Sequence, residues 1–131
     1  MLNRDKKNLK KIFGFDDYKN SQQEIIKEVL EGRDILTVMP TGGGKSLCYQ
    51  LPATLFDGLT LVVSPLIALM QSQVAQLQLL GIKAYCLNSS NSDDENKEII
   101  EMLKSNKIKL LYIAPERLIK NETIDLLKTK K

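Results

Sequence analysis

The chain of 131 residues has no histidine, no tryptophan and only two cysteines. Without histidine, His-based nucleophilic catalysis and the usual Cys/His zinc sites are excluded. Cys48 and Cys86 lie far apart, with no metal-ligand spacing, so a disulfide framework is not expected either. Two scattered thiols are typical of a reducing compartment, and we therefore expect a cytoplasmic protein.

Long apolar runs are also missing. The longest, residues 59–70, is interrupted by Thr60, Ser64 and Pro65 and falls short of the roughly 20 residues that a membrane span needs. Residues 1–11 are charged and have no apolar stretch, so we expect no secretory signal there. With 43% hydrophobic and 27% charged residues, the composition is that of an ordinary soluble domain rather than a disordered chain.

The net charge of +3 is unevenly distributed along the chain. Basic residues are concentrated in residues 1–11 and in residues 128–131, so the stretch between them is mildly acidic. Charged chain ends are usually no more than solvated, and charge alone therefore does not indicate a nucleic-acid partner.

Apolar periodicity predicts helices that alternate with strands. We expect helices over residues 1–12, 21–31, 45–56, 66–80, 92–105 and 115–128, and strands over residues 35–39, 59–63, 82–87 and 108–113. A strand roughly every 24 residues, with a helix in each gap, is the rhythm of right-handed βαβ units. The sequence therefore predicts an α/β fold with a parallel sheet flanked by helices.

Local signals refine this expectation. Ser92 and Glu95 have the spacing of a capping box, and Gly81 is placed to end the helix before it. Pro52 should kink or divide the helix over residues 45–56. The near-continuous apolar strand over residues 59–63 is of the type that is buried on both faces.

The segment between the first expected strand and the following helix carries the clearest chemical motif. It reads Met39-Pro40-Thr41-Gly42-Gly43-Gly44-Lys45-Ser46. Glycines at this point let backbone N–H groups close around an anion at a helix N-terminus. Lys45 can then reach the β- and γ-phosphates, and the Ser46 hydroxyl can ligate Mg²⁺. The pattern predicts a nucleoside triphosphate site.

Two other interpretations of this segment remain open. One is the phosphate loop of a small-molecule kinase. It is disfavoured because the strict phosphate-loop pattern has glycine where Met39 stands. The segment could also be a glycine-rich turn with an incidental Lys-Ser pair.

Four blocks of the chain resemble the RecQ family of DNA helicases, in the same order and at the same distances. They are residues 13–26, 38–50, 62–70 and 110–118, and the likeness spans about residues 13–119. The resemblance implies a RecA-like P-loop NTPase domain that uses ATP and Mg²⁺. It also implies a 3′–5′ helicase that moves along single-stranded DNA and unwinds duplexes in repair and recombination, close to the nucleoid in a bacterium.

The resemblance assigns Gln22 to the adenine edge and places Phe15 and Lys19 against the adenine faces. A carboxamide offers a donor and an acceptor together, and a flat ring offers a stacking surface. In the alternative interpretation, Phe15 is a core residue and Gln22 an exposed residue of the first helical turn.

For single-stranded DNA, the resemblance assigns Ser64, Pro65, Gln73 and Arg117. Ser64-Pro65 and the turn before Arg117 follow expected strands, at the sheet edge where parallel α/β folds bind ligands. The alternatives are an ion pair between Arg117 and a neighbouring acid, and an ordinary exposed helical glutamine at Gln73.

The acidic motif that a phosphate-loop motor needs for hydrolysis is missing from this sequence. The adjacent acids Asp94-Glu95 lie in a polar loop, and Glu116 stands alone after its strand. A phosphate-loop switch or kinase would need an acidic partner as well.

We therefore expect residues 1–131 to be the N-terminal portion of helicase motor domain 1, incomplete at its C-terminal end. Residues 1–33 would form the adenine-side helices, and residues 34–131 the P-loop core without the strand of the acidic motif. The alternative is a truncated, non-catalytic nucleotide- or DNA-binding fragment with no unwinding activity. In either case we expect this part of the sheet to be marginally stable alone, because its apolar strands lack neighbours.

Overall fold

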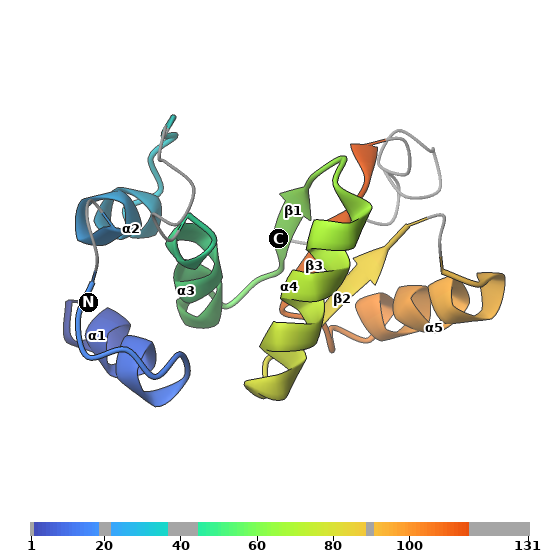
Figure 1. Ribbon diagram of the computed structural model, residues 1–131, viewed down its shortest axis with the longest axis horizontal. Helices are drawn as coiled ribbons and strands as arrows, with labels where there is room; N and C mark the ends of the chain where they lie inside the picture. Colours follow the sequence, from blue (N-terminus) through green and yellow to red (C-terminus); the bar gives the residue numbers. More distant parts are fainter. Residues whose placement is uncertain (1, 19–21, 37–44, 89–90, 116–131) are drawn as a thin grey trace. The chain divides into compact units, whose positions relative to one another are not determined.

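The computed structural model describes residues 2–18, 22–36, 45–88 and 91–115. Within them the elements are α1 (Leu2–Lys11), α2 (Gln22–Leu30), α3 (Leu47–Leu55), β1 (Thr60–Val63), α4 (Ile67–Leu79), β2 (Ala84–Leu87), α5 (Asp93–Lys104) and β3 (Leu110–Ile113) (Figure 1). They form two compact units, Met1–Phe56 and Asp57–Lys131. The α/β fold is confirmed, and no helix in these ranges is long and apolar enough to cross a membrane.

In its described residues, the first unit consists of three helices around a small apolar core. Leu9 from α1, Ile26 from α2 and Leu51 from α3 are fully buried, and Leu47 completes the cluster. A hydrogen bond of 3.0 Å from the Asn8 amide to the Thr54 hydroxyl also joins α1 to α3. The basic helix at the start of the chain is therefore packed into the unit rather than left as a solvated end.

A buried carboxylate lies on the inner face of α1. Asp5 is only 3% exposed, and its Oδ2 accepts a hydrogen bond of 2.5 Å from the Tyr18 hydroxyl. Its Oδ1 is buried and has no hydrogen-bond partner among the described residues. Burial, together with the bond to Asp5, raises the pKa of the Tyr18 phenol, so the proton stays on the hydroxyl. The bond thus ties the segment that follows α1 back onto the helix.

Pro52 does not divide the helix over residues 45–56. The helix α3 continues to Leu55, and the Phe56 N–H donates to the Pro52 carbonyl at 3.1 Å. Pro52 is fully buried. Its packing in the unit compensates for the one helical hydrogen bond that a proline cannot donate.

The second unit contains a parallel sheet in the order β1-β3-β2, which confirms the predicted sheet type. The central strand β3 is buried along its whole length. Leu111 and Ile113 pack with Ile99 and Leu103 of α5 on one face. Successive residues of a strand point to opposite faces, so Tyr112, which bonds α4, marks the other face.

The helices of the second unit begin and end close to the predicted residues. α4 buries Met70, Val74 and Leu77 at helical spacing, and Gly81 follows it with φ of +85°. α5 begins with the predicted capping box, in which the Ser92 hydroxyl accepts from the Glu95 N–H at 3.1 Å. These predictions are confirmed.

One strand prediction needs correction, and another lies mostly outside the described residues. β1 is not buried on both faces, because Leu61 and Val63 are 37% and 47% exposed. In the part of the chain that the structure describes, β1 pairs only with β3, and the core over that face gathers on β2, β3 and α5. Of the strand expected over residues 35–39, only Ile35 and Leu36 are described, and both are exposed and belong to neither a helix nor a strand. The helix over residues 115–128 lies almost entirely outside the described residues.

Substituting Tyr18→Phe should destabilise the first unit. The change removes the hydroxyl that bonds Asp5 and leaves a buried carboxylate acceptor unpaired, which costs about 1–3 kcal/mol. Urea unfolding followed by circular dichroism measures the loss. An alkaline titration followed by absorbance at 295 nm detects tyrosinate, and the difference between the unmodified protein and the variant is the contribution of Tyr18. This difference should develop above pH 10. The stabilising effect of the bond should accordingly be complete below that pH and decline above it. Equal stability of the two proteins at neutral pH would contradict the assigned role.

Candidate functional site

Lys45 and Ser46 lie immediately before α3, at its N-terminal end. The Ser46 carbonyl accepts from the Gln50 N–H at 2.9 Å, which begins the helix. Lys45 is exposed, and the half-buried Ser46 hydroxyl makes no capping hydrogen bond. A helix N-terminus carries unpaired N–H groups and partial positive charge, so a cation and a hydroxyl at this position suit a phosphate tail with its metal.

The predicted cradle itself, Thr41 and Gly42 to Gly44, lies outside the described residues. Mg²⁺ is usually bound by phosphate oxygens, water and only one or two protein oxygens. The one hydroxyl at Ser46 fits that requirement, and the residues present are compatible with ATP and Mg²⁺.

Helix α3 holds this phosphate side firmly in the first unit. Leu47 and Leu51 are buried in the core, and Cys48 next to Leu47 is buried as well. Burial raises the pKa of the Cys48 thiol, which therefore stays protonated and unreactive at neutral pH. Cys48 is therefore a packing residue of the first unit.

The exposures of Phe15 and Gln22 contradict the alternative interpretation of both residues. Phe15 is 45% exposed rather than in the core, and Gln22 is only 3% exposed rather than solvated. The Phe15 N–H donates to the Leu9 carbonyl at 3.1 Å, and Gly14 before it has φ of +78°, which glycine adopts without strain. The aromatic ring is thus presented from a turn that is bonded to α1, whereas Lys19 lies outside the described residues.

The turn after β1 lies beside the end of β3. The Ser64 N–H donates to the Ile113 carbonyl at 3.2 Å, and the Ser64 hydroxyl accepts from the Leu66 N–H at 3.1 Å. Pro65 is exposed next to it. The carboxyl ends of β1 and β3 therefore meet at one edge of the sheet, as the sequence predicted for Ser64-Pro65. Arg117 lies outside the described residues.

Gln73 has a partner within the protein. Its Oε1 accepts a hydrogen bond of 2.9 Å from the Tyr112 hydroxyl, which connects α4 to the central strand. The interpretation of Gln73 as an ordinary exposed glutamine is wrong, because the residue is half-buried. Its amide oxygen contributes to the packing of the second unit.

Two sets of hydrogen bonds that hold the local structure were missed by reasoning from the sequence. The Asp5–Tyr18 bond anchors the turn that presents Phe15, and a signal for it exists, because Asp5 lies four residues before the core residue Leu9 on the same helical face. At the end of β2, Asn88 is fully buried and its side chain donates to the Cys86 sulfur at 2.9 Å. Asn96 of α5 donates to the Asn88 carbonyl at 3.2 Å, which holds α5 to the strand end.

Comparison with known proteins gives the family. Residues 19–130 match the model of the DEAD/DEAH box helicase family. The chain is 49% identical to the ATP-dependent DNA helicase RecQ of Haemophilus influenzae over 123 residues, which are 94% of this chain and 20% of that protein. It is 46% identical to the RecQ helicase of Bacillus subtilis, covering 97% of this chain and 22% of the relative.

A eukaryotic relative is similar over a comparable stretch. The ATP-dependent DNA helicase Q5 of Rattus norvegicus is 54% identical over 82% of this chain and 12% of its own length. The chain thus spans about a fifth or less of the length of these three relatives, between 12% and 22%. With a family match over most of its length and relatives of one kind, the chain belongs to the DEAD/DEAH box helicase family, as an N-terminal motor segment of the RecQ type.

Proposed function

We propose that this chain is the ATP-binding segment of an ATP-dependent 3′–5′ DNA helicase that acts in DNA repair and recombination. The observation that carries the proposal is the placement of three residue types on one packed helical unit. An exposed aromatic ring at Phe15, a buried carboxamide at Gln22 and a cation at Lys45 are all held by α1, α2 and α3. The names of the relatives support the coarser part of the proposal, an ATP-dependent DNA helicase.

In this proposal each part of the nucleotide has its own residues. Gln22 reads the adenine edge, with Phe15 and Lys19 against its faces. Thr41 and Gly42 to Gly44 form the phosphate cradle, Lys45 neutralises the β- and γ-phosphates, and Ser46 ligates Mg²⁺. Lys45 acts as the catalytic cation because it neutralises negative charge shared between the β- and γ-phosphates, including the charge that develops on the leaving β-phosphate in the transition state.

DNA would be held at the turns that follow the parallel strands. Ser64 and Pro65 lie where the ends of β1 and β3 meet, and Arg117 would follow β3 closely in the chain. Backbone N–H groups and side chains at such turns suit the phosphates of a single strand. Gln73 would contribute in two ways: its hydrogen bond to Tyr112 holds α4 against β3, and the residue would lie near the bound single-stranded DNA. We propose a cytoplasmic location, near the nucleoid in a bacterium, because the proposed substrate is DNA.

A second candidate function is supported by the exposure of β1. Leu61 and Val63 present an apolar edge in the described part of the sheet, as expected when neighbouring strands belong to a longer chain. We propose that residues 1–131 are the N-terminal portion of motor domain 1, with residues 1–33 on the adenine side and residues 34–131 forming the P-loop core. On its own such a portion would be a non-catalytic nucleotide- or DNA-binding fragment.

Lys45→Ala in the full-length protein should lower ATP turnover by a factor of about 100–1,000 or more. The substitution removes the charge that stabilises the transferred phosphoryl group, and losing one such contact typically costs that much. Phosphate release in the presence of single-stranded DNA measures the rate. Lys97→Ala, which removes an exposed lysine of α5, is the matched control and should keep the unmodified rate. An unchanged rate in the Lys45 variant would overturn the assignment of the phosphate site.

Gln22→Ala in the full-length protein should reduce the preference for ATP over GTP. A glutamine that pairs with adenine through two hydrogen bonds discriminates by about 1–3 kcal/mol, or about 5- to 150-fold. The ratio of kcat/KM for the two nucleotides measures the effect. The neighbouring Gln23 is exposed, so Gln23→Ala should leave the ratio unchanged. Equal ratios in all three proteins would remove Gln22 from the adenine site.

The 131-residue chain by itself should show no DNA-stimulated ATP hydrolysis above a Lys45→Ala version of the same chain. It lacks the acidic motif that positions Mg²⁺ and the attacking water. Its thermal unfolding, followed by circular dichroism, should be broad or occur at low temperature, because the apolar edge at Leu61 and Val63 has no covering strand among the described residues. A sharp cooperative transition together with DNA-stimulated turnover would contradict the domain assignment.

A further inference from the structure

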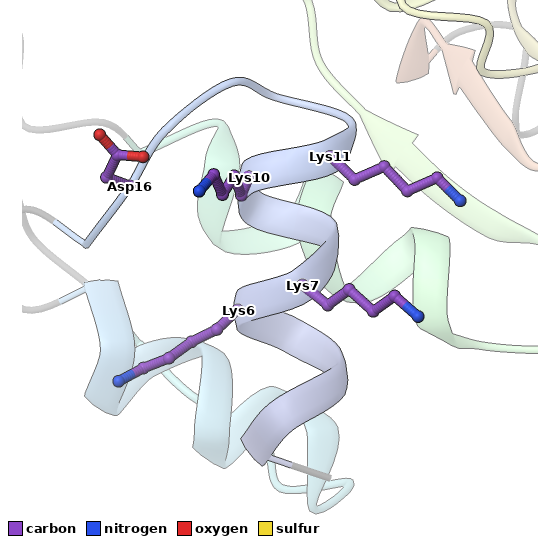
Figure 2. A pocket seen from close by; sticks show the side chains of 5 residues that line it. All are labelled: Lys6, Lys7, Lys10, Lys11 and Asp16. Atoms are coloured by element: carbon purple, nitrogen blue, oxygen red, sulfur yellow. The ribbon is translucent and has the colours of Figure 1, made fainter.

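Four lysines of α1 form one strongly cationic surface, here called the α1 lysine face. Lys6, Lys7, Lys10 and Lys11 line an open depression together with a single acid, Asp16. Figure 2 shows Lys6 and Lys10 projecting to one side of the helix, and Lys7 and Lys11 to the other. The face therefore consists of two pairs of like charges, each pair one helical turn apart.

The internal structure of the protein does not account for this arrangement. Like charges four residues apart destabilise a helix by about 0.2–0.5 kcal/mol per pair. The helix dipole favours the last-turn residues Lys10 and Lys11, but it does not favour Lys6 and Lys7. Among the described residues, the ion pairs involve Arg33 and Lys104 and none of these four lysines.

The acid that could neutralise the face is turned inward. Asp5 is the one acidic residue of α1, and its carboxylate is buried against the Tyr18 hydroxyl. Leu9 is buried in the core on the same inner side. The four lysines are thus carried by a helix fixed at three points, including the Asn8–Thr54 bond, and are not part of a solvated chain end.

The shape and chemistry of the α1 lysine face fit an extended polyanion. Pockets for small molecules enclose most of the ligand surface, whereas this depression is wide open to solvent and carries four ammonium groups and one carboxylate around it. A membrane surface requires an apolar helical face beside the basic one, but Leu9 of α1 is fully buried in the protein core. A nucleic-acid backbone needs only closely spaced cations.

We propose that the α1 lysine face binds the phosphate backbone of DNA, as a sequence-independent contact additional to the strand-end turns of the second unit. The inference rests on the proposed helicase function and adds a DNA-binding surface to it. Phosphate contacts of this kind hold a protein on its substrate without reading bases. Their number determines how steeply affinity falls with salt.

The test is the salt dependence of single-stranded DNA binding by the full-length protein. In the variant Lys6→Gln, Lys7→Gln, Lys10→Gln and Lys11→Gln, glutamine keeps the helix propensity and removes the charge. The slope of log Kd against log salt, measured by fluorescence anisotropy with a labelled oligothymidylate, should fall by about 3, because each phosphate contact on a single strand contributes about 0.7. The variant with only Lys6→Gln and Lys7→Gln should lose about half as much.

A matched control removes four other exposed lysines and thus the same net charge. Lys27, Lys83, Lys97 and Lys107 lie on α2, before β2, on α5 and before β3. Their replacement by glutamine should leave the slope close to that of the unmodified protein. If the two quadruple variants lose the same slope, or if neither loses any, the proposal is overturned.

Two further measurements separate this proposal from its competitors. At saturating DNA, the α1 variant should have the same KM for ATP as the unmodified protein. The same measurement shows that the first unit of the variant is folded. A raised KM together with an unchanged DNA slope would assign the lysines to nucleotide binding and overturn the proposal. Binding to phosphatidylserine vesicles that the variant loses, again with an unchanged DNA slope, would assign them to a membrane.

The proposed function is tested separately from this surface. If single-stranded DNA does not stimulate ATP hydrolysis by the unmodified protein, the helicase assignment fails and the inference fails with it. If DNA stimulates hydrolysis but the slope of the α1 variant equals that of the control variant, only the inference fails.

Discussion

The packing of α1, α2 and α3 around Leu9, Ile26 and Leu51 is the interaction on which the candidate nucleotide site depends. Each of the three helices packs into this core and has one residue of the site at or near one of its ends. The turn with Phe15 is bonded to α1, Gln22 opens α2, and Lys45 precedes α3. Because protein interiors are close-packed, these three positions are held relative to one another without any direct bond between the functional side chains.

The Asp5–Tyr18 bond gives this unit a polar constraint in addition to its apolar core. Burying the carboxylate is costly, and the phenol offsets part of that cost by donating a short hydrogen bond. The same bond has a second consequence, since it removes the only acid of α1 from the surface. The outer face of the helix is therefore left cationic, so one buried contact affects both the turn that carries Phe15 and the charge of the α1 lysine face.

Much of the secondary structure could be predicted because its signals are local. The capping box of Ser92 and Glu95, the apolar spacing of α4 and the parallel direction of the strands depend on neighbours in sequence or on chain connectivity. The exposure of Leu61 and Val63 could not be predicted in that way. An apolar strand has the same sequence whether its neighbours are present or not, so its burial is a property of the whole sheet.

The sequence by itself determined the family and the residue types of the site, because a phosphate loop requires glycine, lysine and serine at set spacings along the chain. Only the tertiary structure decided that Phe15 is exposed while Gln22 is buried, that Gln73 bonds Tyr112, and that Asp5 is buried beneath the lysines of α1. Exposure and partnership depend on which distant segments pack against a residue, and spacing along the chain does not specify them.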